Sequence, residues 1–247
     1  MISLCNKVAL VTGASNGIGR ATAIMLAEFG ADVFVHYNSS EDAAQETAKK
    51  IMSMGRKAHL IKADISNHEE IKEMFSYIKK KSGKLDILVN NAGIARMNYI
   101  NYMKEEEWDE VIDTNIKGTF LCCKYGLKLM IKSESAKIVN VSSDAAFTPG
   151  VRQINYVVSK SAIISMTRAM AKEVGVFGIC VNAVAPGPIK TDLNRWDDEE
   201  ETRIKKLIPL QRIGEPDDVA KVITFLCSSL ANYISGQVIQ IDGGIAP

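Results

Sequence analysis

The stretch INYVVSKSA, residues 154–162, places Tyr156 four residues before Lys160. In a helix this spacing sets both side chains on one face, one turn apart. An ammonium near a phenol favours the phenolate and lowers the phenol pKa from its ordinary value of about 10. A ketone reduced by hydride transfer becomes an alkoxide that must receive a proton, which such a phenol can supply. Tyr156 and Lys160 are therefore a candidate catalytic pair.

The same spacing occurs a second time, because YIKKK contains Tyr77 and Lys81. The surroundings of the two pairs differ. Ser143 stands thirteen residues before Tyr156 at the end of an apolar run, whereas Asp64 stands thirteen residues before Tyr77. A serine hydroxyl can donate a hydrogen bond to a substrate oxygen and stabilise developing charge. We therefore assign Tyr156 and Lys160 to a site, and Tyr77 and Lys81 to a solvated helix.

The segment TGASNGIG, residues 12–19, lies between an apolar run and a helical pattern. Its glycines leave room for a tight turn and for a pyrophosphate to approach the backbone. The helix that begins there offers unpaired N–H groups and the positive end of its dipole. A simple turn between a strand and a helix would also use glycines, but the position of the segment in the first unit of the chain favours nucleotide binding.

Short apolar runs alternate with longer helical patterns along the chain. The expected strands are residues 8–12, 32–37, 58–64, 85–93, 137–143, 180–187 and 237–244. The expected helices cover about 18–29, 41–54, 68–82, 104–131, 156–175 and 216–229. Strands that are apolar on successive residues are typical of a parallel sheet covered on both faces. We predict one α/β domain over 1–247, a Rossmann-like doubly wound parallel sheet of about seven strands with helices on both faces.

The composition is that of an ordinary globular protein, with 47% hydrophobic residues, 24% charged residues and a net charge of +1. This balance gives no reason to expect nucleic acid or a membrane as a partner. The five cysteines form no C-x-x-C pair, which favours reduced thiols and a cytoplasmic location. The histidines, His36, His59 and His68, lie on separate expected elements, so no metal site is predicted.

The glycine spacing G-x-x-x-G-x-G begins a series of motifs. After it come Asp64, NNAG at 90–93, Asn115, Ser143, Tyr156, Lys160, PGPIKT at 186–191 and SGQVIQIDGG at 235–244. In this order the chain resembles the classical short-chain dehydrogenase/reductase family over nearly its whole length. Within that family it looks most like the 3-oxoacyl-thioester reductases, including those that act on acyl carrier protein.

The resemblance implies roles for individual residues. The implied catalytic residues are Asn115, Ser143, Tyr156 and Lys160, with Lys160 also holding the nicotinamide ribose and Asn115 holding a water in a proton relay. The alternative for Asn115 is a polar residue that satisfies backbone groups in a long helix. The implied cofactor-binding residues are Gly13, Ser15, Asn16, Gly17, Ile18, Gly19, Tyr37, Asn38, Ser39, Asp64, Ile65, Asn91, Ala92, Gly93, Tyr156, Lys160, Pro186, Gly187, Ile189 and Thr191.

The end of the second expected strand bears on the choice of cofactor. Relatives that use NAD(H) usually have an acidic residue there to bind the adenosine ribose. Here Tyr37 is followed by Asn38, Ser39 and Ser40, which favours NADP(H). Asn16 is evidence for NAD(H), because many NADP-using relatives have Arg at that place. His36 could add positive charge or simply belong to the strand.

The substrate is less well defined by the sequence. By resemblance, residues 192–210 form a substrate lid in which Trp196, Leu207 and Ile208 supply either substrate contacts or packing. Reductases that dock an acidic carrier protein tend to have basic residues beside the pocket mouth, where this chain has Glu134 and Phe177. Docking of an acyl carrier protein is therefore doubtful. Asp144 is interpreted as a loop cap, with a carboxylate that contacts substrate as the alternative.

These observations predict an NADP(H)-dependent reductase of a ketone, in the first place a 3-oxoacyl thioester, with Tyr156 as proton donor. The same site would serve a dehydrogenase of a sugar, steroid or other secondary alcohol, or a specialised biosynthetic ketoreductase. A non-catalytic nucleotide-binding regulator would be expected to have lost Ser143, Tyr156 or Lys160, and all are present. The resemblance also implies a homotetramer in which the helices at 104–131 and 156–175 pack across a twofold axis.

Overall fold

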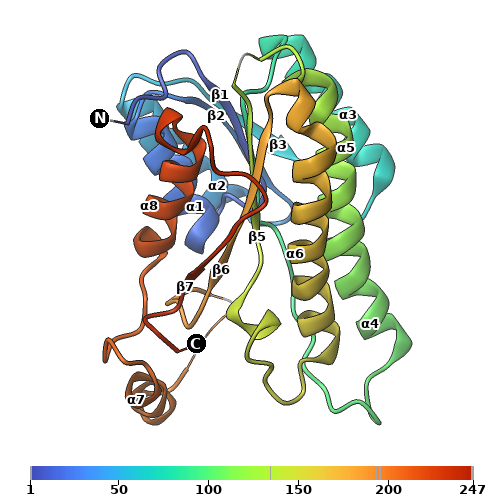
Figure 1. The fold of residues 1–247 in the computed structure, drawn as a ribbon, viewed down its shortest axis with the longest axis vertical. Helices are drawn as coiled ribbons and strands as arrows, with labels where there is room; N and C mark the ends of the chain where they lie inside the picture. The colour runs from blue at the N-terminus through green and yellow to red at the C-terminus, as the bar shows by residue number, and fades with distance from the viewer. Residues whose placement is uncertain (1, 134, 193, 195, 246–247) are drawn as a thin grey trace.

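The computed structural model describes residues 2–133, 135–192, 194 and 196–245. Its strands are β1 (Val8–Val11), β2 (Asp32–Tyr37), β3 (Ala58–Lys62), β4 (Ile87–Asn90), β5 (Lys137–Val141), β6 (Cys180–Pro186) and β7 (Val238–Ile241). Within the described residues they form one sheet in the order β3-β2-β1-β4-β5-β6-β7. Every neighbouring pair is parallel. The predicted doubly wound parallel sheet is confirmed (Figure 1).

Helices cover both faces of this sheet. They are α1 (Gly17–Glu28), α2 (Glu41–Ser53), α3 (His68–Ser82), α4 (Glu105–Ile112), α5 (Thr119–Met130), α6 (Ile154–Val174), α7 (Asp198–Leu207) and α8 (Pro216–Cys227). Figure 1 shows α1 and α8 on one face and α3, α5 and α6 on the other. Their apolar faces make two core layers, one on each side of the sheet.

The side chains of each strand point alternately to the two faces of the sheet, and this explains why the apolar runs are continuous. In β1, Ala9 and Val11 belong to the layer under α1, α2 and α8, whereas Leu10 belongs to the layer under α3, α5 and α6. Successive side chains of a strand point to opposite faces, so both must be apolar when both faces are covered. All three of these residues are completely buried.

The structure divides the helix that the sequence predicted over 104–131. After α4, the residues Asp113–Gly118 form a π-helical turn before α5 begins. Gly118, the last residue of this turn, packs against the backbone of Ile65, since a Cβ on Gly118 would lie 2.5 Å from the Ile65 carbonyl oxygen. Apolar periodicity cannot reveal one wider turn, which is why a single helix was expected.

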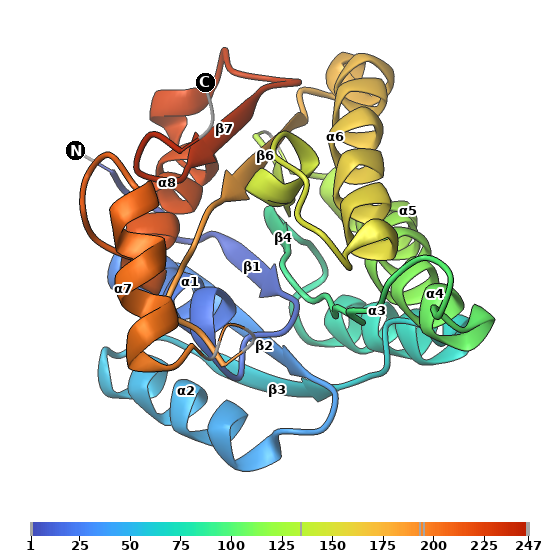
Figure 2. The same ribbon diagram turned by 90° about the horizontal axis from the view of Figure 1, so that it is seen from below.

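The strands end in a row at one edge of the sheet, onto which Figure 2 looks. The strand order reverses between β1 and β4, where an open α/β sheet forms its ligand crevice. α7 lies beside this edge. Among the described residues, no helix combines the length and apolar character needed to cross a bilayer.

Candidate active site

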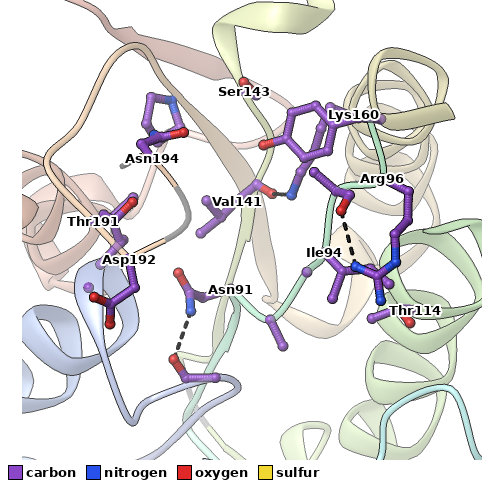
Figure 3. Close-up of a pocket in the computed structure, with 18 of the residues that line it drawn as sticks. Asn91, Ile94, Arg96, Thr114, Val141, Ser143, Lys160, Thr191, Asp192 and Asn194 are labelled. Carbon is purple, nitrogen blue, oxygen red and sulfur yellow. Dashed lines mark hydrogen bonds between the residues drawn. The ribbon is translucent and has the colours of Figure 1, made fainter. Parts of the chain in front are cut away.

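A cleft of about 1260 Å³ opens at this edge of the sheet. It extends from the glycine loop, across the end of β4, to Ser143, Tyr156 and Lys160 (Figure 3). Every predicted cofactor-binding residue except Gly19 lines it. The cleft exceeds the range of about 300–1,000 Å³ that is usual for small-molecule pockets, as an elongated ligand plus a second molecule would require.

The glycine loop adopts the conformation that its residues predicted. Gly13 and Gly17 have φ angles of +64° and +53°, in the left-handed region that favours glycine. Gly19 lies beneath the loop, because a Cβ there would collide with the Gly13 carbonyl oxygen. Gly19 thus lets α1 pack against the loop and does not line the cleft, and its predicted part in cofactor binding stays a prediction.

His36, on β2, supports the loop from below. The Gly13 N–H donates a hydrogen bond to His36 Nδ1 at 3.0 Å, so the ring proton is on Nε2, which faces the Ala63 carbonyl oxygen at 3.0 Å. Burial lowers the pKa of His36 to about 4, against a smaller opposing effect of the Ala63 hydrogen bond. The ring is therefore neutral at physiological pH and adds no positive charge for a cofactor phosphate.

Thr12 and Asn91 connect the loop to the segment after β4. The Thr12 hydroxyl accepts hydrogen bonds from the Asn91 and Ala92 N–H groups, each at 3.0 Å. The Asn91 amide donates in return to the carbonyl oxygens of Thr12 and Gly13, at 2.9 and 3.1 Å. These bonds fix the floor of the cleft, and the Asn91 contact is visible in Figure 3.

The predicted pair on α6 lies at the other end of the cleft. Lys160 is 5% exposed, and its Nζ donates to the Val141 carbonyl oxygen at 2.9 Å (Figure 3). The same Nζ lies 5.5 Å from the centre of the Tyr156 ring. Burial lowers the pKa of Lys160 to about 8. Ser143 is also buried and follows β5, which ends at Val141, two residues earlier than the sequence predicted.

The protein's own groups raise the pKa of Tyr156 above its ordinary value of 10.0. Burial is the largest cause; a hydrogen bond with Ser143 opposes it, and the nearby charge of Asp144 adds to it. Tyr156 therefore carries its proton in the protein alone. The lowering that the sequence suggested from Lys160 is not produced by these contacts.

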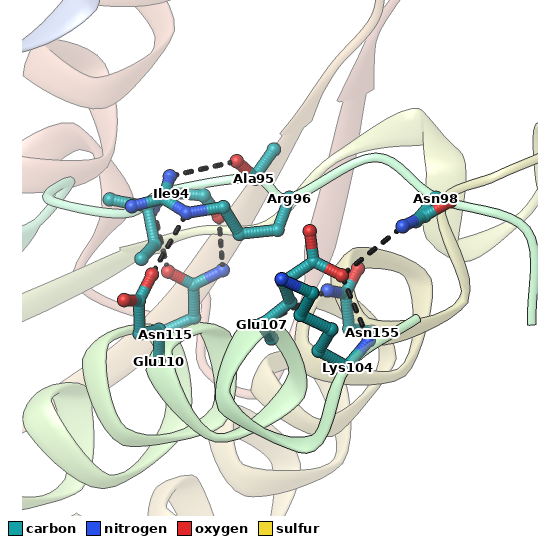
Figure 4. A network of polar contacts seen from close by, with 9 residues as sticks. All are labelled: Ile94, Ala95, Arg96, Asn98, Lys104, Glu107, Glu110, Asn115 and Asn155. Carbon is teal, nitrogen blue, oxygen red and sulfur yellow. Dashed lines mark hydrogen bonds and ion pairs between the residues drawn. The ribbon is translucent and has the colours of Figure 1, made fainter. Parts of the chain in front are cut away.

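Two residues that the sequence did not single out hold α6 in place. The Ser142 hydroxyl donates to the Lys160 carbonyl oxygen at 2.7 Å. The Asn155 amide donates to the Glu107 carbonyl oxygen at 3.1 Å, and its oxygen accepts the Tyr156 N–H at 2.7 Å. Figure 4 places Asn155 beside α4. Sequence alone gave no signal for either contact, because each depends on which helices become neighbours.

Asn115 projects from the π-helical turn and is 1% exposed. Its amide nitrogen donates to the Ile94 carbonyl oxygen at 2.9 Å and to Ser159 Oγ at 3.0 Å, and its oxygen accepts the Ile94 N–H at 2.8 Å (Figure 4). It does not line the cleft. The side chain thus satisfies backbone groups, as in the alternative interpretation, and the water-holding role stays a prediction.

Asp144 begins a short 3-10 turn directly after Ser143 and lines the cleft. Its Oδ1 accepts a hydrogen bond from Ser143 Oγ at 2.9 Å. Burial raises the pKa of Asp144, hydrogen bonds from Ser143 and the turn's backbone oppose this, and Asp242 adds to it. The N-cap of this turn is Ser143, whose Oγ accepts the Ala145 N–H at 3.2 Å, and Asp144 adds a carboxyl group to the lining of the cleft.

The remaining residues that the sequence singled out fall into two groups, those that line the cleft and those that do not. Trp196 lines the cleft, whereas Ile208 is buried against Gly243 and Leu207 is 69% exposed. Tyr77 and Lys81 lie on α3, where the Lys81 Nζ sits 5.6 Å from the Tyr77 ring centre, and neither lines the cleft.

The expected positions for carrier-protein docking require a correction. Phe177 follows the C-terminal end of α6, whereas Tyr156 lies in its first turn. The two are separated by the length of the helix, roughly 30 Å. Within this chain Phe177 is thus far from Tyr156, because α6 runs antiparallel to the strands that it connects. Glu134 lies outside the described residues.

Comparisons with known proteins agree with this geometry. A family model described as enoyl-(acyl carrier protein) reductase matches residues 13–246. The 3-oxoacyl-(acyl-carrier-protein) reductase FabG of Staphylococcus epidermidis is 43% identical over 241 residues, 97% of this chain and 99% of that protein. A short chain dehydrogenase from Burkholderia cenocepacia, solved in complex with NADP, has a TM-score of 0.94 at 34% identity and covers 98% of each chain.

A further solved structure is the angucycline C-6 ketoreductase LanV with bound NADP. It has a TM-score of 0.92 at 34% identity and covers 98% of this chain and 96% of that one. The chain belongs to the short-chain dehydrogenase/reductase family of oxidoreductases. The family and enzyme class predicted from the motifs are confirmed, and the NADP complexes of two relatives support the predicted cofactor.

Proposed function

We propose that this protein is an NADP(H)-dependent reductase that converts a 3-oxoacyl thioester to the 3-hydroxy product, with Tyr156 as the proton donor. The observation that carries this proposal is the meeting of Ser143, Tyr156 and Lys160 at one end of a cleft whose other end is the glycine loop. Both ends belong to one cleft. A dinucleotide whose pyrophosphate lies at the glycine loop could therefore place its nicotinamide beside the phenol of Tyr156.

The residues around the floor of the cleft fit such a nucleotide. Gly93 packs closely against two polar side chains there, since a Cβ would meet Asn115 Oδ1 at 3.1 Å and Lys160 Nζ at 3.4 Å. Asn91 to Gly93 would pass beneath the adenosine ribose, and Asp64 would face the adenine. Lys160 would hold the nicotinamide ribose, with Ile189 and Thr191 near the carboxamide. All of these residues except Asn115 line the cleft.

The choice of NADP(H) rests on the groups after β2. Asn38, Ser39 and Ser40 line the cleft, and Ser40 precedes the N-terminus of α2. Polar side chains and free helical N–H groups at this place can bind a 2′-phosphate. Glu41 and Asp42, in the first turn of α2, weaken this preference by their charge. The NADP-bound relatives favour the phosphate-bearing cofactor.

The chain's own residues then have distinct tasks. The nicotinamide, when bound, supplies the hydride. Tyr156 gives its proton to the oxygen on which negative charge develops, and its raised pKa keeps that proton in place beforehand. Lys160 stabilises the phenolate left behind, because its ammonium lies on the same side of the helix. Ser143 contacts the same substrate oxygen and helps to fix its position.

The acyl thioester is proposed from the 43% identical FabG relative. Asp144 favours a second candidate, because a half-buried carboxylate in the substrate half of the cleft suits a ketone that bears a hydroxyl or other hydrogen-bond donor. A specialised ketoreductase such as LanV is the relevant comparison. Whether the acyl group arrives on a carrier protein, and whether the chain forms a homotetramer, stay predictions.

The decisive assay follows NADPH oxidation by absorbance with acetoacetyl-CoA, with an acetoacetyl carrier protein, and with a set of free ketones that includes hydroxylated ones. Turnover of the thioesters supports the proposal, and turnover of hydroxylated ketones alone would replace it with the second candidate. Tyr156→Phe should abolish turnover while NADPH binding, measured by fluorescence, changes little. Unchanged turnover in that variant would remove Tyr156 from the mechanism.

A further inference from the structure

Two loops meet at the mouth of the substrate half of the cleft. Met97, in the loop between β4 and α4, lines the cleft, and so do Gly150 and Gln153, in the loop before α6. A hydrogen bond joins the two loops, because the Asn98 N–H donates to the Arg152 carbonyl oxygen at 2.9 Å. Arg152 therefore lies at this mouth, between two residues that line the cleft.

Arg152 is held in a backbone conformation that few side chains adopt. Its φ angle is +69°, in the left-handed region that favours glycine. Its guanidinium lies over the Tyr99 ring, 5.5 Å from the ring centre. The Asn98 amide fixes the loop that carries this ring: it donates to the Tyr102 carbonyl oxygen at 3.1 Å and to Glu107 Oε2 at 3.3 Å, the latter shown in Figure 4. A strained residue that its surroundings hold in place is a candidate for a functional role.

The charge of Arg152 is not matched by a carboxylate. Among the residues that the structure describes, no ion pair includes it. Arg96, on the other loop, is by contrast paired with Glu110 at 2.8 Å. The part of the cleft that α4 lines is acidic, with Glu106 and Asp109 among its residues. An anionic group that enters here needs a cation, and a guanidinium can bind two phosphate oxygens at once.

We propose that Arg152 binds the phosphate at the far end of the pantetheine arm of a 3-oxoacyl thioester. The inference rests on the proposed function and specifies its substrate as a phosphopantetheine thioester. The Cα atoms of Arg152 and Tyr156 are at most about 14 Å apart, because they are four residues apart in the chain. The arm can span this distance with its ketone at Tyr156. Val151 and Ile100, next in sequence to Arg152 and Tyr99, are exposed and can contact the methyl groups of the arm.

The test compares acetoacetyl-4′-phosphopantetheine with acetoacetyl-pantetheine, which differ only in the phosphate, at saturating NADPH. In the native protein kcat/KM should be about fivefold higher for the phosphorylated thioester, mainly through KM, as expected for an exposed charge pair. Arg152→Gly, whose backbone tolerates the positive φ, should bring this ratio close to one. A ratio near one in the native protein, or an unchanged ratio in Arg152→Gly, would overturn the proposal.

Two further variants separate the charge of Arg152 from other effects. Arg152→Gln removes the charge but retains a side chain, and it should lose the preference as Arg152→Gly does; a loss in Arg152→Gly alone would assign the effect to the backbone of the loop and refute the proposal. Arg168→Gln is the matched control, because Arg168 is exposed on α6 and does not line the cleft. It should leave the ratio unchanged, and an equal loss there would reduce the effect to net charge.

The phosphate can belong to coenzyme A or to a carrier protein, and the same variants distinguish the two sources. Arg152→Gly should raise the KM of acetoacetyl-CoA, of an acetoacetyl carrier protein, or of both, according to which arm reaches this residue. An unchanged KM for both would overturn the proposal. If the native protein reduced none of these thioesters, the proposed function itself would fail, whereas equal turnover with and without the phosphate would remove only the role of Arg152.

Discussion

The backbone N–H of Gly13 donates to Nδ1 of His36 across 3.0 Å, so a completely buried imidazole forms the underside of the glycine loop. The other ring nitrogen faces Ala63, at the end of β3. One side chain thereby links the loop to the ends of β2 and β3. The contact sets where the loop's backbone lies, and that backbone is the surface proposed to bind the pyrophosphate.

His36→Ala should weaken NADPH binding, because the Gly13 N–H loses its acceptor and the loop loses its support. The loss of a buried hydrogen bond costs about 1–3 kcal/mol, so we expect roughly tenfold weaker binding with a smaller change in kcat. His36→Asn, which retains an acceptor, should recover much of it. His59→Ala is the matched control, since His59 stacks on Phe34 and does not line the cleft. Equal fluorescence titrations for all three variants would refute the prediction.

His36 should also make the protein less stable in acid. Its pKa is lowered to about 4 in the folded protein, below the ordinary 6.5. Between these values the unfolded chain binds a proton and the folded one does not, so stability falls as pH decreases from 6.5 toward 4. The loss is up to about 3 kcal/mol at 1.36 kcal/mol per pH unit. Urea unfolding at pH 7 and pH 4.5 should show a smaller difference in His36→Asn; the same difference in both proteins would assign it to other groups.

Lys160 should set the alkaline limb of ketone reduction. Burial lowers its pKa to about 8, whereas the pKa of Tyr156 is raised above 10.0. As pH rises through 8, the free enzyme loses the ammonium while the phenol keeps its proton. The value of kcat/KM should therefore fall above pH 8, and Lys160→Arg should move any residual limb to higher pH. A limb that appears only above pH 10 would assign the titration to Tyr156.

Asn38→Asp should change the cofactor preference toward NADH. The carboxylate would stand at the end of β2, where it repels a 2′-phosphate and can accept hydrogen bonds from ribose hydroxyls. We expect kcat/KM with NADPH to drop at least tenfold and that with NADH to rise. Asp42→Asn, in the first turn of α2, is the control and should favour NADPH slightly by removing a negative charge. A native protein that already prefers NADH would contradict the assignment of Tyr37 to Ser40.

Asn115→Ala should destabilise the fold, because it leaves the N–H and the carbonyl of Ile94 without their partners. Each buried unpaired group costs about 1–3 kcal/mol, so the free energy of unfolding should fall by about 2 kcal/mol or more. Thermal and urea unfolding measure this directly. A variant of native stability whose turnover alone is lost would instead support the water-holding role that the family resemblance implies.

The two Tyr-x-x-x-Lys pairs of the chain show how much can be predicted from sequence. Tyr156 and Lys160 were distinguishable from Tyr77 and Lys81 because spacing within one helix, and the strand before it, are local properties. The glycine loop and the strand ends followed from the same kind of pattern. Phe177 was placed wrongly beside the pocket mouth, because position along the chain does not tell which end of a helix lies at which edge of the sheet.

The sequence by itself determined the parallel sheet, the glycine loop after its first strand and the helix that carries Tyr156 and Lys160. The sheet was predicted from short continuous apolar runs, the loop from residues that tolerate positive φ, and the helix from its residue spacing. Each of these signals extends over only a few residues. Only the tertiary structure decided that His36 is neutral, that Asn115 holds Ile94, and that Asp144 accepts a hydrogen bond from Ser143. Charge and proton direction depend on burial and on partners from distant segments, and those exist only after the chain has folded.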